Sequence, residues 1–242
     1  MKRVLAVLSF LIPTILAGSA FAAGQFGSPE PLAREDGYSF GVGYFSYSEK
    51  FKNSDGFSDI SAVHSQIYGE VTAAGWNLAE SGEAFLRIGG ADFEGGGITT
   101  GSKFYGNAGW RDRWYRKGNF AVGTVLQGSY YGGYEGKISS GLTSVNLKIT
   151  GEWDASLGLG FQYRVLDMLR IYAGPYIGYA SFKAERTATG GTPSQSDVKY
   201  ESKQWYGGYA GARATIIKGL NIVGEARFGS DFSGGVSLSY SF

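Results

Sequence analysis

Residues 149–164 alternate without interruption between two kinds of side chain, and this run limits the possible folds more than any other segment. Its odd positions are Ile149, Gly151, Trp153, Ala155, Leu157, Leu159, Phe161 and Tyr163, and its even positions are Thr150, Glu152, Asp154, Ser156, Gly158, Gly160, Gln162 and Arg164. Because successive side chains of a strand point to opposite faces, the run predicts one long β-strand with an apolar face and a polar face. At roughly 3.3 Å per residue and a tilt of about 40°, the stretch from Trp153 to Tyr163 covers about 25 Å, the height of the apolar band of a membrane barrel.

The same period of two continues along most of the chain from Tyr38 onward. It predicts ten strands, although eight remain possible: about 38–48, 61–75, 83–93, 103–114, 120–131, 146–164, 169–183, 200–216, 220–228 and 234–242. Short connectors are expected near 76–82, 115–119, 165–168 and 217–219, and longer polar ones near 49–60, 94–102, 132–144 and 184–199. An even number of strands with short turns on one side is typical of bacterial single-chain barrels.

The first 22 residues have the pattern of a cleaved signal peptide. Lys2 and Arg3 precede a short apolar run, and small residues end it at Ala22. Cleavage there would remove two basic residues and no acidic one, so that the 22 basic and 21 acidic residues of the full chain become 20 and 21. A nearly neutral chain is a poor nucleic-acid binder, and no nucleic-acid partner is expected. Residues 23–37, rich in Gly, Pro and charge, are expected to form a periplasmic tether, with residues 38–242 forming the barrel.

Alternation alone does not say which face meets lipid. In a soluble barrel the apolar face would point inward. Long charged side chains of both signs on the polar faces favour the inverted arrangement, because they suit a crowded lumen in which charges pair. The inward charges are expected to be Glu70, Arg87, Glu152, Asp154, Arg164, Lys203, Arg213, Glu225 and Arg227. Inward aromatic residues are expected to narrow the lumen further: Tyr68, Phe85, Tyr172, Trp205 and Tyr209.

The last strand ends on alternating apolar residues, Val236, Leu238, Tyr240 and Phe242. Together with the signal sequence and hairpins such as LGLGFQYRVLDMLRIYAGPYIGYASF, this ending resembles the small outer-membrane β-barrel superfamily of Gram-negative bacteria, the OmpA, OmpX and opacity-protein type. The resemblance implies a closed, antiparallel, up-and-down transmembrane β-barrel in the outer membrane. It also implies that the four terminal residues are a signal for the barrel-assembly machinery. The best-known members have eight strands, whereas this chain has material for ten.

The sequence gives little support for catalysis. There is no cysteine and one histidine, His64, so neither a metal site nor a cofactor is expected. His64 and Ser65 are adjacent on a predicted strand and therefore point to opposite faces. The chain lacks the His-x-Ser arrangement of lipid A deacylases, and Ala62 stands where an omptin-type protease would need Asp. No enzyme activity is therefore expected.

The expected function is structural or surface-interacting, through the long external loops. A narrow passive channel is the alternative, and a lipid A-modifying or proteolytic barrel is a third possibility. Outer-membrane lipid and lipopolysaccharide are the expected surroundings, and the sequence does not identify a ligand for the loops.

Overall fold

The computed structural model describes residues 25–33, 37–53, 59–75, 81–95, 98–140, 143–189, 194–202, 206–229 and 232–242. The predicted signal peptide lies outside these ranges, as do Lys203 and Trp205. No helix in the described ranges is both long enough and apolar enough to cross a membrane.

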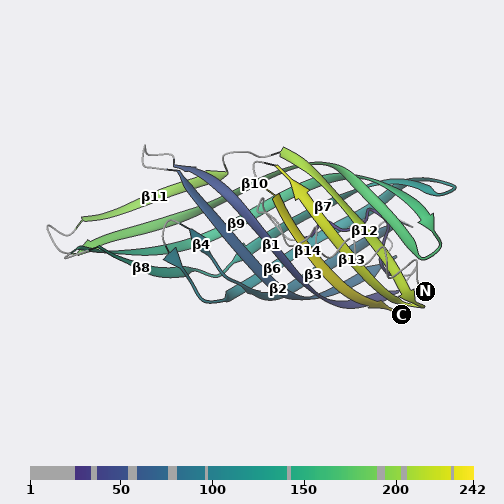
Figure 1. Cartoon of the computed structure of the whole chain (residues 1–242), viewed down its shortest axis with the longest axis horizontal. Coiled ribbons are helices and arrows are strands. Elements are labelled where there is room, and N and C mark those ends of the chain that lie inside the picture. The colour runs from purple at the N-terminus through teal and green to yellow at the C-terminus, as the bar shows by residue number, and fades with distance from the viewer. Residues whose placement is uncertain are drawn as a thin grey trace.

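Ten antiparallel strands form a closed barrel, as the sequence predicts (Figure 1). In chain order they are β1 (Tyr38–Asn53), β2 (Ile60–Ala74), β3 (Gly82–Ala91), β6 (Lys103–Lys117), β7 (Phe120–Tyr131), β9 (Thr143–Leu166), β10 (Leu169–Thr189), β12 (Tyr206–Ile217), β13 (Leu220–Phe228) and β14 (Phe232–Ser241). Each strand pairs with its neighbours, and the ring closes where β1 pairs with both β2 and β14. Closure leaves this ring without a free sheet edge, which hydrocarbon surroundings require.

Short turns and both ends of the barrel chain lie on one side. Two-residue turns join β6 to β7, β9 to β10, and β12 to β13. The last of them uses Gly219, whose φ of 89° lies in the left-handed region that glycine tolerates. The amide of Phe242 donates to the carbonyl of Tyr38 at 3.0 Å, so the first and last strands meet there. We call this side the short-turn end.

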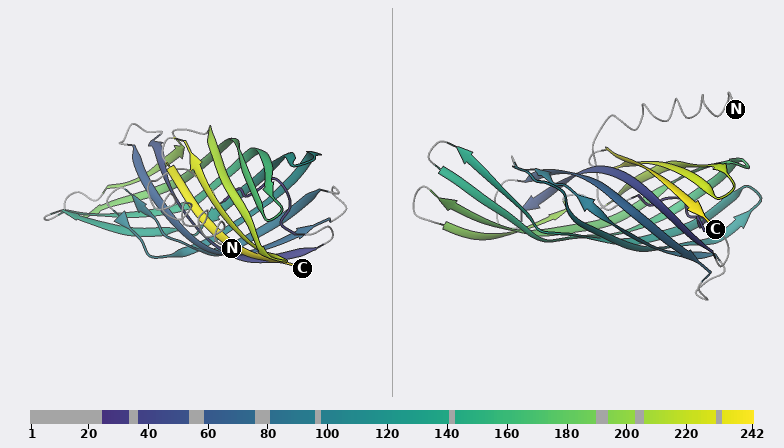
Figure 2. Two further views of the ribbon diagram at one scale, coloured as in Figure 1. Left: turned by 45° about the vertical axis from the view of Figure 1, so that its right-hand side comes forward. Right: turned by 90° about the horizontal axis from the view of Figure 1, so that it is seen from below.

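The opposite end is built from strands where the sequence predicts loops. β9 has 24 residues and β10 has 21, about twice what a membrane-spanning strand needs. β8 (Tyr134–Ser140) pairs with β9, and β11 (Ser194–Ser202) pairs with both β10 and β1. A small hairpin, β4 (Glu94–Gly95) with β5 (Ile98–Thr99), adds to β2. Figure 2 shows the long hairpins extending beyond the barrel, away from the C-terminus.

These strands correct several expectations. The connectors expected at 132–144 and 184–199 contain strand, as the one at 94–102 does through β4 and β5, and the single strand expected over 200–216 is two, β11 and β12. The signal was hidden because residues beyond the apolar band are polar on the outer face too, so the contrast between faces is lost.

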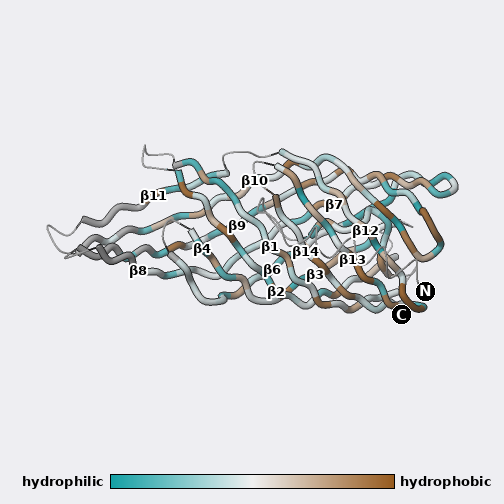
Figure 3. The backbone as a smooth tube through the Cα atoms, viewed as in Figure 1, coloured by the Kyte–Doolittle hydropathy of each residue, from teal (hydrophilic) through white to brown (hydrophobic). Residues whose placement is uncertain are grey.

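The outer surface carries the apolar half of the alternation. Along β9 the odd positions from Trp153 to Tyr163 point outward and the even positions are buried, as predicted. Trp153 is 45% exposed and Tyr163 is 51% exposed. Figure 3 shows hydrophobic and hydrophilic residues alternating along the strands. This is the surface that lipid would solvate.

An aromatic pair marks the outer limit of this apolar band. The rings of Trp153 and Tyr179 lie 5.5 Å apart on neighbouring strands. Just beyond them Gly151 adopts a φ of 62°, and the β9–β10 register shifts between Ser181 and Lys183. Past this bulge the exposed residues are polar, Lys148 and Lys183 among them.

Candidate functional site: a chain segment inside the barrel

Residues 25–33 lie inside the barrel, and we call them the plug segment. Phe26 and Ser28 are buried, as are Gln25, Glu30 and Ala33. The sequence predicts a periplasmic tether over 23–37, and for these residues that expectation does not hold. Their Gly- and Pro-containing sequence forms no regular strand, so their backbone groups have no sheet partners. Charged side chains in a lumen can satisfy such backbone groups instead.

Two lumen carboxylates hold the backbone amides of the plug segment. Glu225 on β13 accepts hydrogen bonds from the amides of Phe26 at 2.8 Å and Gly27 at 2.7 Å. Glu83 on β3 accepts from the amides of Leu32 and Ala33, both at 2.7 Å. Hydrogen bonds to ionised acceptors are among the stronger ones, so each end of the segment has a charge-assisted anchor.

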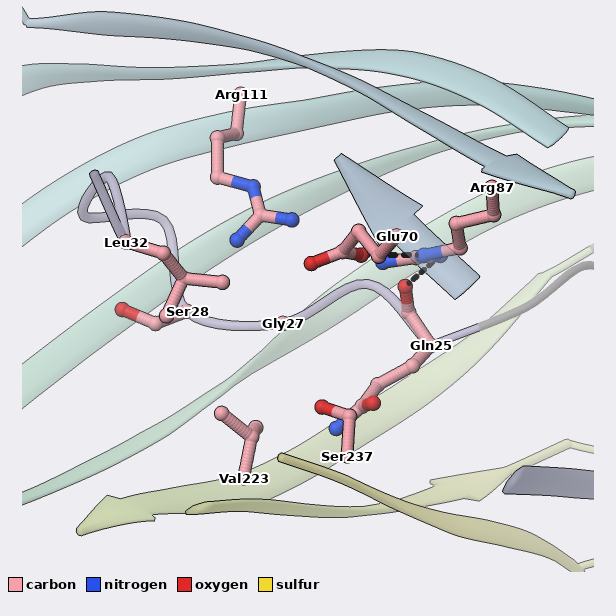
Figure 4. Close-up of a pocket in the computed structure, with 9 residues that line it drawn as sticks. All are labelled: Gln25, Gly27, Ser28, Leu32, Glu70, Arg87, Arg111, Val223 and Ser237. Atoms are coloured by element: carbon pink, nitrogen blue, oxygen red, sulfur yellow. Dashed lines mark hydrogen bonds and ion pairs between the residues drawn. The ribbon is translucent and has the colours of Figure 1, made fainter. Parts of the chain in front are cut away.

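Two lumen arginines hold its carbonyls. Arg87 on β3 donates to the carbonyl of Gln25 at 2.6 Å, and Arg213 on β12 donates to the carbonyls of Glu30 at 3.1 Å and Pro31 at 3.0 Å. Figure 4 shows the segment running between Glu70, Arg87 and Arg111 on one side and Val223 and Ser237 on the other. The cavity lined by these residues measures about 10 Å³, close to the room that one water molecule needs.

Phe26 packs the plug segment against the wall. Its ring lies 4.8 Å from that of Tyr209 and 5.4 Å from that of Tyr176, and the Arg227 guanidinium carbon lies 3.9 Å from its centroid. Glycines on β9 make room for the segment. A Cβ on Gly160 would lie 2.9 Å from Cγ of Pro29, which is closer than real Cβ atoms approach.

The carboxylate of Glu30 is the most heavily coordinated group in the plug segment. Gln162 donates to it at 2.6 Å. Four guanidinium groups surround it: Arg170 at 3.2 Å, Arg113 at 3.4 Å, Arg116 at 3.5 Å and Arg213 at 3.6 Å. We call these six residues the Glu30 cluster. Burial alone would raise the pKa of the Glu30 carboxyl, but the Gln162 hydrogen bond and the arginine charges outweigh it and lower the pKa.

A β-bulge explains how Arg113 and Arg116 reach the same carboxylate. Counted in twos, these residues belong to opposite faces of β6. The β6–β7 register shifts between Arg113 and Tyr115, so that Trp114 is an extra residue on β6. Trp114 and Tyr115 both point outward as a result, and Arg116 returns to the lumen face.

The lumen charges named from the sequence are distributed over several contacts. Arg87 pairs with Glu70 at 2.5 Å, and Arg227 with Glu225 at 3.2 Å. Arg213 turns instead to the plug segment, and Arg164 is half-buried near the short-turn end. The structure therefore brings four of these charges together in two pairs and directs another, Arg213, to residues 30 and 31.

Glu152 and Asp154 lie farther from the short-turn end, among aromatic rings. Glu152 lies 3.1 Å from Nε2 of His64, and Asp154 accepts from the Tyr131 hydroxyl at 3.0 Å. His64 is fully buried and stacks on Tyr47, with ring centroids 4.6 Å apart. Around them, the half of the lumen farther from the short-turn end is filled by an apolar cluster that includes Phe51, Tyr105, Tyr134, Phe182 and Tyr200.

Sequence reasoning missed several residues of this site: Glu30, Glu83, Arg111, Arg113, Arg116 and Arg170. Strand parity could have placed Glu83 and Arg111 on the lumen face, where their side chains pair at 3.2 Å. Glu30 had no such signal, because the plug segment follows no period. No group of three or more acidic or histidine residues suited to a metal ion occurs within the described ranges.

No protein-family model and no curated protein matches this sequence. Solved structures do match by fold. The translocator domain of the autotransporter NalP from Neisseria meningitidis superposes with a TM-score of 0.52 at 12% identity, over 100% of this chain and 95% of that one. The fold is that of an outer-membrane β-barrel. The outer-membrane protease OmpT from Escherichia coli (TM-score 0.49, 11% identity, 89% of this chain and 100% of that one) and OprG from Pseudomonas aeruginosa (0.42, 13%, 87% and 99%) are also similar.

Proposed function

We propose that this chain is an outer-membrane β-barrel protein with a closed lumen, which acts through the end opposite the short turns. That end consists of β8, β11 and the parts of β9 and β10 beyond Gly151 and Ser181, and we call it the extension. The observation that carries the proposal is the filling of the lumen. The plug segment occupies the half near the short-turn end, and the aromatic cluster around His64 occupies the other half. The cavity between the plug segment and Arg111 has room for about one water molecule.

The outer surface supports a location in the outer membrane. The exposed aromatic and aliphatic side chains form an apolar band on all ten barrel strands, and the signal-peptide pattern at residues 1–22 would export the chain. Val236, Leu238 and Tyr240 on β14, the strand that closes the ring with β1, and Phe242 just after it are all exposed. Their exposure is consistent with their proposed role as a signal for the assembly machinery.

The extension supports a role at the cell surface, in contact with lipopolysaccharide or an external partner. In this barrel class short turns face the periplasm, so the extension would face outward. It has its own apolar interior, since the rings of Phe51 and Phe182 lie 4.7 Å apart and those of Phe182 and Tyr200 lie 4.9 Å apart. A packed interior makes a long hairpin rigid enough to present a fixed surface.

The alternatives have less support. A narrow channel would need a continuous path past both the plug segment and the aromatic cluster around His64. A protease or lipid A-modifying enzyme would need a reachable catalytic group, and His64 is 0% exposed and stacked on Tyr47. Ser65 points to the other face of β2, and its backbone amide donates to the Asp92 carboxylate at 2.7 Å.

Planar-bilayer recording on the refolded mature protein tests the proposal. A closed lumen predicts no discrete conductance steps at any salt concentration. Electrophoretic mobility before and after boiling would verify that the recorded sample is a folded barrel. Discrete, salt-dependent steps from such a sample would contradict the closed-lumen proposal and favour the channel.

A further inference from the structure

The Glu30 cluster contains more positive charge than its one carboxylate neutralises. Four guanidinium groups lie within 3.6 Å of Glu30. Arg164 is a fifth cation nearby, because it pairs directly across the sheet with Arg170. Its Nε is buried without a hydrogen-bond partner, as is Nε of Arg213. Glu83, another lumen acid, is already engaged by Arg111 and by two plug-segment amides.

The cluster is open to water on one side. Arg213 and Glu30 are deepest, with side chains 5% and 7% exposed. Exposure then rises through Arg170 at 19% and Arg113 at 25% to Arg116 at 43%. Exposure therefore increases from Glu30 and Arg213 toward Arg116, which lies two residues before the β6–β7 turn at the short-turn end.

The cluster lies on the lumen side of the barrel wall and not on the lipid side. At the β6 bulge, Trp114 and Tyr115 occupy the outer surface, while Arg113 and Arg116 occupy the inner one. A ligand would therefore arrive from the aqueous phase beside the short turns. Arginine forks match planar carboxylates and phosphates in charge and geometry.

We propose that the Glu30 cluster is a binding site for the carboxylate or phosphate group of a soluble anion, and that Glu30 fills this site from within the chain in the resting protein. The ligand would enter from the periplasmic side in the orientation proposed above. Several arginines around one singly charged group favour a ligand with more negative charge than Glu30 carries. This inference concerns the mouth of the barrel and does not depend on the role of the extension.

Calorimetric titration of the detergent-solubilised mature protein would test the site. The probes are inorganic phosphate, which carries the phosphate group, and succinate, which carries carboxylates, each compared with chloride at equal ionic strength so that general screening is the same. E30Q keeps the size of the side chain and one acceptor oxygen but removes its charge. We expect E30Q to bind at least one probe about tenfold more tightly than the wild type does, the value of one charge-assisted hydrogen bond.

Two further variants show whether the gain belongs to this site. R116Q removes the most exposed guanidinium of the cluster, so E30Q/R116Q should lose most of the gain, whichever probe binds. E135Q changes an exposed glutamate on β8, far from the short-turn end, and should behave as the wild type does. Equal affinities of E30Q and wild type in samples that show folded-barrel mobility would overturn the proposal. A gain that persists in E30Q/R116Q would also overturn it.

Discussion

Glu225 is the main anchor of the plug segment at Phe26 and Gly27. Its carboxylate accepts from two backbone amides and from the Tyr172 hydroxyl at 3.1 Å, and it pairs with Arg227. E225Q would weaken all of these contacts at once inside a buried site. We expect a loss of roughly 2–3 kcal/mol in the free energy of unfolding, measured in urea with the protein in lipid vesicles. E135Q, on the exposed face of β8, is the control and should change it little; an equal loss in both variants would contradict this assignment.

Glu30 makes the plug segment sensitive to acid. Its pKa is lowered in the folded protein from an ordinary value of 4.5, so the released segment binds more protons than the bound one. The stabilisation is therefore complete above about pH 4.5 and is lost as the pH falls through the lowered value. Amide exchange of residues 25–33, expressed as protection relative to the free peptide, should fall in that acidic range. In E30Q this part of the pH dependence should be absent, and its persistence there would assign it to another group.

At the scale of elements, the position of the plug segment depends on the space left by the glycines of β9 as well as on the charged lumen residues that bind it. G160A would bring a Cβ to 2.9 Å from Pro29 and to 2.8 Å from the Tyr209 hydroxyl. We expect about 1–3 kcal/mol of overpacking, relieved by displacement of the segment. Amide exchange should show faster exchange at residues 25–33 and unchanged exchange in the barrel strands. G208A is the matched control, because its Cβ would meet only a carbonyl at 3.7 Å; equal effects of both variants would refute the packing argument.

The barrel strands could be predicted from sequence because each carries its own evidence. Trp153 to Tyr163 shows both faces of β9 within a few residues, so neither partner strand is needed to recognise it. The plug segment carries no such evidence, since its position depends on Glu83, Arg87, Arg213 and Glu225 from three other strands. Arg116 was hidden by a different cause. One extra residue, Trp114, reverses the parity of the strand after it, and no local pattern marks that insertion.

At the scale of the whole molecule, two structures of different origin fill the lumen. The plug segment is not part of any barrel strand and precedes β1 in the chain. The aromatic cluster around His64 comes from the strands themselves, through Tyr47, Tyr105 and Tyr131 among others. A seal built from barrel residues does not require the plug segment to be present.

Deletion of residues 25–33 therefore separates the two seals. The shortened barrel should still assemble, because its strand pairing does not include the plug segment. It should be less stable, since Glu83, Glu225 and Arg213 lose hydrogen-bond partners in a confined lumen. It should also remain non-conducting in planar bilayers, because the packed rings near His64 still block the path. Y47A/Y131A in the deleted chain removes two large rings from that layer, and only this combination should produce conductance steps. Steps from the deletion alone would mean that the plug segment is the sole barrier and that the upper cluster is permeable.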